Sequence, residues 1–512
     1  MDAMNLPVND TAWPPTPLKP VFNMIDEASA WWAGEPQRLS SHYAGSQRVR
    51  PSQFDGGLVG ATSRFFWGKP PTPGQQNIKL HLPMAADLAN TSASMLFDTP
   101  PKFMADDGKA QKRLDLMLNN DRFPSDLLVG GESCAALGGV AWRIIWNMDT
   151  ADQPWVDFVD ADSIIPEYSY GRVKAITFVE ELEVIDKNHV HRLLSRYSKG
   201  RIDYGLYKGK DDNLGVAVPF EEHPATQSIT TIVDADSGVL TGAPGIAAGY
   251  IPNAMPVVGF RKSGILKNYG RPDISTDLWP LLDFLDETWT NLRREMRLSK
   301  AKVLVPEYLL DNGKFGEGMS YDHDRETYST VNAPPSAGVK PEMFQPDIRV
   351  DKLLQVAEAT SLEILRRANY SPSTFGWDGK STQMTAREID DRYQATLQTW
   401  RAKSRYWKAG MSEMAVDLLA VDNYIFKGGA TLQEPPVIEF TAPVQETMKD
   451  KAQTLQALDG ARAISTETKV DYLWPEWPDA QREQEVERIN LQNSGAMDYM
   501  GALGLDEPLE QE

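Results

Sequence analysis

The sequence predicts an α+β protein in which a β-rich lobe is combined with several long helices. Between residues 139 and 260, short runs of β-branched and aromatic residues are separated by turn residues, which indicates strands. Elsewhere, apolar residues recur at spacings of three and four, which indicates amphipathic helices. Residues 349–420 are the most informative stretch, because two long helical patterns there are separated by a short segment that interrupts them.

Composition places the chain among ordinary globular proteins. Its 512 residues, 41% hydrophobic and 24% charged, are enough for roughly three or four domain-sized cores. The chain has neither an apolar run of the roughly 18–20 residues that a bilayer span needs nor a signal-peptide pattern at its start. The only cysteine, Cys134, cannot form an internal disulfide. We therefore expect a soluble protein made in a cytosol, with Cys134 as a small buried thiol.

The net charge is −20, so the surface as a whole repels nucleic acid. Any contact with DNA must then be local or weak.

The N-terminal half begins with predicted helices and continues into strands. A short helix is expected in VFNMIDEASAWWAG, a second over residues 81–97, and a third amphipathic run near 110–140. Among the strands that follow, Lys199-Gly200 is placed as a hairpin turn. Residues 235–256 contain clusters of Gly and Pro, and we expect a loop there.

A long helix is predicted after Gly270, with an apolar face that begins at Leu278 and ends at Met296. Its last turns are basic, as suits a helix C-terminus. These cations are Arg293, Arg294, Arg297 and Lys300. The next segment, 304–345, holds one strand-like run among Gly, Pro and polar residues, so we interpret it as a small insertion between two long helices.

The second long helix of this pair ends at the segment NYSPSTFGWDGKSTQM. There Pro372 disfavours helical backbone at Ser371, while Gly376 and Gly379 supply turns. A further helix begins at a T-x-x-E capping box, Thr385 to Glu388, and carries an apolar face as far as Leu418. Such long helices favour packing between several copies, so we expect a subunit of a ring whose polar loop faces a shared centre. A short strand in PPVIEFTAPV and an acidic, helix-forming end from about residue 444 follow.

The sequence motifs of known catalytic sites are incomplete or absent in this chain. Gly379-Lys380-Ser381-Thr382 resembles the end of a P-loop, but the position that requires the first glycine holds Thr374. His189 and His191 alternate on a predicted strand without a third ligand, which favours a solvated strand face over a metal site. No nucleophile elbow or H-E-x-x-H motif is present. We therefore predict no catalytic residues, no cofactor and no metal, and a structural protein rather than an enzyme.

The order of these parts resembles that of the portal proteins of tailed bacteriophages, in particular the long-tailed siphophage type. Five segments carry the resemblance: WWAGEPQRLSSHY, HLPMAADLANTSASMLFDTPPKF, TDLWPLLDFLDETWTNLRREMRLSKAKVLVP, ANYSPSTFGWDGKSTQMTAREI and ARAISTETKVDYLWPEWPDAQREQEVERI. The resemblance implies a wing (1–270), a first stem helix (271–303), a clip (304–345), a second stem helix (346–369), a tunnel loop (370–384), a long wing helix with a β segment (385–443) and a helical crown (444–512). The clip-like stretch has little recognisable pattern.

The resemblance also implies a function and partners. It implies a homo-oligomeric ring, commonly a dodecamer, at one capsid vertex of the virion, assembled in the host cytoplasm without a membrane. Double-stranded DNA would enter and leave through its channel without sequence-specific contacts. The terminase large subunit, head-completion or adaptor proteins, and the major capsid and scaffolding proteins would bind it. The residues expected to face DNA are Ser373, Thr374, Trp377, Asp378, Lys380, Ser381 and Gln383 of the tunnel loop. The stem cations Arg293, Arg294, Arg297 and Lys300 would form a second ring near the DNA, or several of them would instead pair with acidic residues of a neighbouring subunit.

Two alternatives stay open at this point. Another ring-forming head–tail connector or a scaffold-like protein would share the long helices and the lack of catalytic motifs. A packaging ATPase is less favoured, because it requires a true P-loop.

Overall fold

The computed structural model contains helices and sheets in two compact units, so the α+β class is confirmed. The first unit comprises Met1–Pro372 and Gln398–Thr441, and the second comprises Ser373–Leu397 and Ala442–Glu512. The structure describes residues 6–43, 79–184, 189–298, 302–306, 328–331, 342–344, 349–377, 386–432, 434–441, 448–461, 463–474, 477 and 479–502. Within these ranges, the backbone alone is described for some residues: 297–298, 302–306, 328–331, 342–344, 386–392, 448–450, 453, 479–480 and 493–502.

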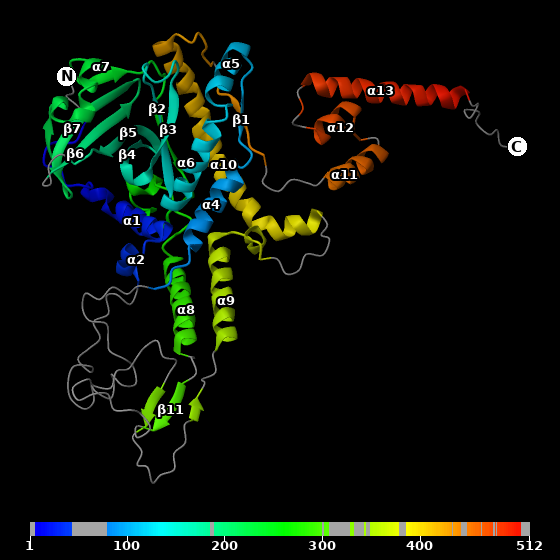
Figure 1. Ribbon diagram of the computed structural model, residues 1–512. Helices are drawn as coiled ribbons and strands as arrows, with labels where there is room; N and C mark the ends of the chain where they lie inside the picture. The colour runs from blue at the N-terminus through cyan, green and yellow to red at the C-terminus, as the bar shows by residue number, and fades with distance from the viewer. Residues whose placement is uncertain are drawn as a thin grey trace. The chain divides into compact units, whose positions relative to one another are not determined.

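Helices dominate the start of the first unit (Figure 1). They are α1 (Lys19–Ala33), α2 (Pro36–His42), α4 (Met84–Phe97), α5 (Gly108–Met117) and α6 (Phe123–Leu137). The single amphipathic run expected near 110–140 is therefore two helices. The side chain of Asn120 explains the break, because its Oδ1 accepts hydrogen bonds from the backbone N–H groups of Arg122 and Phe123, each at 2.9 Å.

The β-rich lobe is built from two antiparallel sheets. The larger has the order β4-β5-β6-β7-β8, with β9 also paired to β7. These strands are β4 (Ile164–Ser169), β5 (Arg172–Glu181), β6 (Val190–Ser198), β7 (Arg201–Lys210), β8 (Asn213–Val218) and β9 (Gly238–Leu240). The predicted turn at Lys199-Gly200 is confirmed: it joins β6 to β7, and Gly200 has a φ of 72°, a conformation that favours glycine.

The smaller sheet has the order β10-β2-β3 and corrects the expected loop at 235–256. Its strands are β2 (Gly139–Ile145), β3 (Trp155–Asp160) and β10 (Ala248–Pro252), so the supposed loop supplies both β9 and β10. Gly249 was interpreted as a loop residue, but close packing explains why a glycine is needed there. A Cβ on Gly249 would lie 2.5 Å from the indole of Trp142, so this position must be small for β10 to pair with β2.

The main core lies around the smaller sheet, α4, α6 and the last part of α10 (Ala386–Val421). The indole of Trp407 is central to it, 4.8 Å from the ring of Phe97 and 5.9 Å from that of Phe158 between centroids. Met411, Met414 and Leu418 of α10 are fully buried, so this half of the predicted apolar face is confirmed. A five-residue π-helical segment (Asp422–Phe426) ends the helix, and β14 (Val437–Glu439) then pairs with β1 (Lys102–Met104).

Two further long helices belong to the first unit and pack on each other (Figure 1). They are α8 (Trp279–Leu298) and α9 (Val350–Ala368). Between them in the sequence are three short strands that form one sheet: β11 (Lys302–Pro306), β12 (Tyr328–Val331) and β13 (Glu342–Phe344). The pair β11 and β12 is parallel.

The second unit is helical. It contains the first turns of α10 and three C-terminal helices, α11 (Met448–Gly460), α12 (Thr466–Leu473) and α13 (Asp479–Ala502). The side chain of Ser465 caps α12 by accepting from the N–H of Thr468 at 3.3 Å. The predicted capping residue of α10, Thr385, lies outside the described residues.

Candidate functional site

The two long helices α8 and α9 are the first part of the candidate site, because they lead to and from the predicted insertion. Tyr43, at the end of α2, and a short segment before α4 are fixed to α8 by hydrogen bonds. The buried carboxylate of Asp286 accepts from the Tyr43 hydroxyl (3.0 Å) and the Leu82 N–H (3.0 Å), and it lies 2.8 Å from Nδ1 of His81. Burial, together with the charge of Asp286, raises the pKa of Tyr43. The hydroxyl therefore keeps its proton and remains a donor.

A buried cluster lies where α8, α9 and α10 meet α4, and we call it the junction cluster: Ser92, Asp273, Tyr370 and Lys403. The ammonium of Lys403 lies 2.5 Å from a carboxylate oxygen of Asp273 and 2.5 Å from the hydroxyl of Ser92. The Tyr370 hydroxyl donates to the same oxygen of Asp273 at 2.8 Å. The side chains of Lys403 and Asp273 are only 3% and 7% exposed, so this ion pair is almost removed from water.

The junction cluster joins segments that are far apart in the sequence. Asp273 precedes α8, Tyr370 follows the end of α9, and Lys403 lies in α10. Next to it, Asn369 ends α9 in the left-handed conformation (φ 61°), and its side chain donates to the Thr399 hydroxyl at 2.8 Å. The cluster therefore fixes both the start of α8 and the end of α9 to α10.

The predicted tunnel loop, residues 370–384, begins at Tyr370 of the junction cluster and belongs to the second unit from Ser373 onward. A 3-10 helix (Pro372–Phe375) lies within it, and the hydroxyls of Thr374 and Thr396 are hydrogen-bonded at 2.7 Å. The Tyr393 hydroxyl donates to the carbonyl of Ser373 at 3.3 Å. Of the predicted loop residues, Trp377 is exposed and Ser373 and Thr374 are half-buried, while Asp378, Lys380, Ser381 and Gln383 lie outside the described residues.

Three of the predicted stem cations, Arg293, Arg294 and Arg297, lie near the C-terminal end of α8. Arg293 and Arg294 are exposed there, and the side chains of Arg297 and Lys300 lie outside the described residues. A groove of about 480 Å³ runs between α8 and α9 at this level. It is lined by Asn291, Arg294, Glu295, Arg349, Lys352, Leu353 and Val356. Of these lining residues, Arg294 alone was a predicted site residue, because the other cations, Arg349 and Lys352, lie more than 50 residues from it in the sequence.

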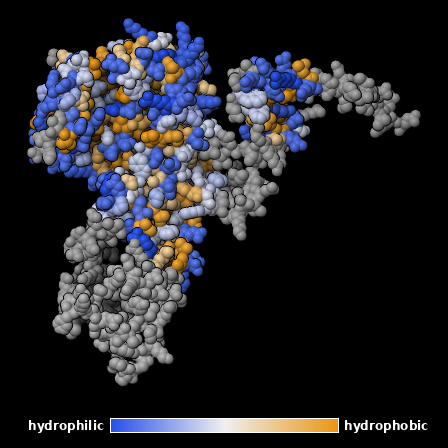
Figure 2. Space-filling model, in the orientation of Figure 1, coloured by the Kyte–Doolittle hydropathy of each residue, from blue (hydrophilic) through white to orange (hydrophobic). Residues whose placement is uncertain are grey.

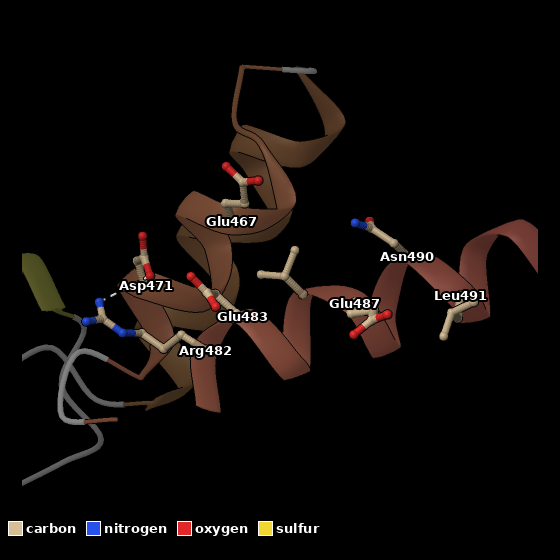
Figure 3. A pocket seen from close by; sticks show the side chains of 8 residues that line it. Glu467, Asp471, Arg482, Glu483, Glu487, Asn490 and Leu491 are labelled. Carbon is tan, nitrogen blue, oxygen red and sulfur yellow. Dashed lines mark hydrogen bonds and ion pairs between the residues drawn. The ribbon is translucent and has the colours of Figure 1, made fainter. Parts of the chain in front are cut away.

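The second unit carries a groove of its own, between α12 and α13, of about 870 Å³ (Figure 3). Four carboxylates line it: Glu467, Asp471, Glu483 and Glu487. Arg482 is the cation in its lining, and it pairs with Asp471 at 3.2 Å. The groove is therefore acidic, as the sequence of this end predicted, and it does not favour binding of a polyanion.

The residue types that bind metals do not gather into a site in the described part of the chain. No group of three or more His, Cys, Asp or Glu side chains there could hold a metal ion. Cys134 is buried in α6, as expected. His191, expected on a solvated face, is instead 3% exposed, with its ring 5.4 Å from that of His223. The reason is that the segment following β8, which carries His223, covers that side of β6.

Comparison with known proteins decides the family. The sequence profile of the family described as "Phage portal protein, SPP1 Gp6-like" matches residues 70–499, which is most of the chain. The chain belongs to this family of phage portal proteins. A search of curated proteins gives no match. Of the five segments that carried the resemblance, WWAGEPQRLSSHY lies before the matched range and the other four lie within it.

The function of the chain is therefore that of a portal protein: a component of the bacteriophage virion that acts in genome packaging. Portal proteins form homo-oligomeric rings and interact with DNA, terminase and the capsid, and the family is structural rather than enzymatic. No helix among the described residues of the portal chain is long and apolar enough to cross a membrane.

Proposed function

We propose that about twelve copies of this chain form a ring at one capsid vertex, through which double-stranded DNA enters during packaging and leaves during ejection. The family match carries the proposal, and two features of the chain support it. The paired helices α8 and α9 leave one end of the first unit together and are connected through a small sheet. The net charge of −20 gives a wall that repels DNA and so allows it to slide.

The parts of the chain take the following roles in this proposal. Residues 1–270 form the wing, 271–303 and 346–369 the two stem helices, 304–345 the clip, 370–384 the tunnel loop, 385–443 the long wing helix with its β segment, and 444–512 the crown. The clip would bind the terminase large subunit during packaging and head-completion proteins afterwards. We assign this docking role to residues 304–345 because an insertion between two antiparallel helices lies at their shared end.

The tunnel loop would carry the contacts to DNA. Pro372 and Gly376 interrupt the helices on either side, and Trp377 is exposed. Lys380 is the one cation between Ser371 and Met384, so the ring would place one such charge per subunit near the phosphates. Arg293 would add a second ring of charge, and Arg294 would either join that ring or pair with acidic residues of a neighbouring subunit. Such contacts are weak and carry no base information.

A packaging assay with two variants tests this assignment. Deletion of residues 304–345 should abolish packaging while rings still form, because only the docking element is lost. Lys380→Glu should change the rate of packaging, DNA retention or ejection, and Lys408→Glu, on an exposed face of α10, should change none of them. Normal packaging by the deletion variant would remove the clip assignment, and wild-type rates for Lys380→Glu in all three steps would remove the role of the loop charge.

A further inference from the structure

Helix α9 contributes to two exposed surfaces of opposite charge, one acidic and one basic. One, the acidic stripe, consists of Asp351, Leu354, Glu358 and Leu362, whose spacings of three and four place them on one side of the helix. Leu354 and Leu362 are 40% and 37% exposed although they are apolar. Within the described part of the chain, no ion pair is found for Asp351 or Glu358. The acidic stripe is thus a solvent-facing mixture of carboxylates and leucines, and its carboxylates have no ion-pair partner among the described residues.

The opposite flank of α9 forms a wall of the groove described above, which we call the basic groove. Three cations line it, Arg294, Arg349 and Lys352, against one carboxylate, Glu295. Glu295 pairs with Arg349 and accepts from its backbone N–H at 3.3 Å, so Arg294 and Lys352 carry the remaining positive charge. Val356, also in the lining, is 40% exposed and supplies an apolar surface. Figure 2 shows such hydrophobic and hydrophilic side chains next to each other along this pair of helices.

The acidic stripe and the basic groove overlap along the helix axis between residues 351 and 356, and they point in different directions. Asp351 and Lys352 are neighbours in the sequence, and at 3.6 residues per turn the stripe and the groove flank are roughly 150° apart around α9. Two different, complementary surfaces on opposite sides of one element produce a head-to-tail contact between copies. Repeated around an axis, such contacts close into a ring when the rotation from one copy to the next divides a full turn, and otherwise they give an open filament.

We propose that the acidic stripe of one copy docks into the basic groove of the next copy in the ring. Asp351 and Glu358 would face Arg294 and Lys352 of the neighbour, and Leu354 and Leu362 would pack near its Val356. A second copy of the chain fits better than DNA, because DNA would match the basic groove and leave the acidic stripe unused. This inference rests on the proposed ring and specifies which surfaces form its stem contacts.

Charge reversal provides the test. One variant, Asp351→Lys/Glu358→Lys, reverses the acidic stripe, and a second, Arg294→Glu/Lys352→Glu, reverses the basic groove. Each variant alone would bring like charges together at every contact, so we expect its ring fraction at micromolar concentration to fall at least about tenfold. An equal mixture should restore rings, because alternating copies again present opposite charges at every contact. Arg366→Glu/Arg367→Glu, which changes exposed cations outside the basic groove, is the control and should assemble like wild type.

Mass photometry gives the ring fraction, and circular dichroism confirms that each variant is folded. Two outcomes would contradict the proposed contact while leaving the portal ring in place. In the first, wild type forms rings and either variant alone assembles equally well. In the second, wild type forms rings but the folded variants fail to assemble on mixing. If the wild-type chain forms no rings under any tested condition, the ring itself and the contact are both overturned. Loss in each variant with recovery in the mixture supports the contact.

Discussion

Replacement of Lys403 by methionine is expected to lower the free energy of unfolding by about 3–5 kcal/mol, the usual cost of leaving a buried charge without its counter-ion. Lys403 and Asp273 are 3% and 7% exposed, and the ammonium is the cation that pairs with this carboxylate. Methionine fills a similar volume but removes the charge. Asp273 would keep only neutral donors, the Tyr370 hydroxyl at 2.8 Å and the Asn253 side chain at 2.8 Å.

Denaturant unfolding, with the tryptophan fluorescence as the signal, measures this loss. Lys408→Met is the matched control, since Lys408 is an exposed lysine of the same helix, and its effect should stay within about 0.5 kcal/mol. The double variant Lys403→Met/Asp273→Asn should recover part of the loss, because no buried charge is then left uncompensated. An effect of Lys403→Met equal to that of the control would show that the ion pair does not hold the junction cluster together.

Replacement of Asp417 by asparagine is expected to stabilise the chain at neutral pH. This side chain of α10 is 6% exposed, and burial raises the pKa of Asp417 to about 6, with a further contribution from Glu413. Below the ordinary value of 3.8, the carboxyl is protonated in both the folded and the unfolded chain. Between pH 3.8 and about 6 the unfolded chain ionises while the folded chain keeps the proton, so stability falls across this window. The loss is complete once pH has risen through about 6, and it amounts to about 3 kcal/mol at 1.36 kcal/mol per pKa unit.

The asparagine variant avoids that penalty, because its side-chain oxygen can still accept from the Gly245 N–H, 3.1 Å away in the wild type. We expect the difference in unfolding free energy between variant and wild type to be largest at pH 8 and to vanish near pH 4. Asp211→Asn, at an exposed hairpin position, should follow the wild-type curve. A constant difference between pH 4 and 8 would mean that Asp417 does not titrate in this range.

Periodic patterns allowed much of the fold to be predicted. The spacing of Trp407, Met411, Met414 and Leu418 identified the buried face of α10, because apolar residues three and four apart share a side of a helix. The β-rich lobe followed from its β-branched residues, and the hairpin at Gly200 from its turn residues. These features depend on residues close together in the sequence.

The parts that were missed depend on long-range contacts. Lys403 lies 130 residues from Asp273 and 311 from Ser92, and nothing near it in the sequence distinguishes it from the exposed Lys408. Strand β10 was interpreted as a loop, since its Gly249 is needed for contact with Trp142 and not for a turn. The cations of the basic groove come from two helices, so only their packing brings Arg349 and Lys352 to Arg294.

Electron microscopy of the purified chain shows directly whether its copies form a portal ring. We expect closed rings of about twelve subunits with an axial channel. Monomeric particles that show no ring at any concentration, and that hydrolyse ATP, would contradict it.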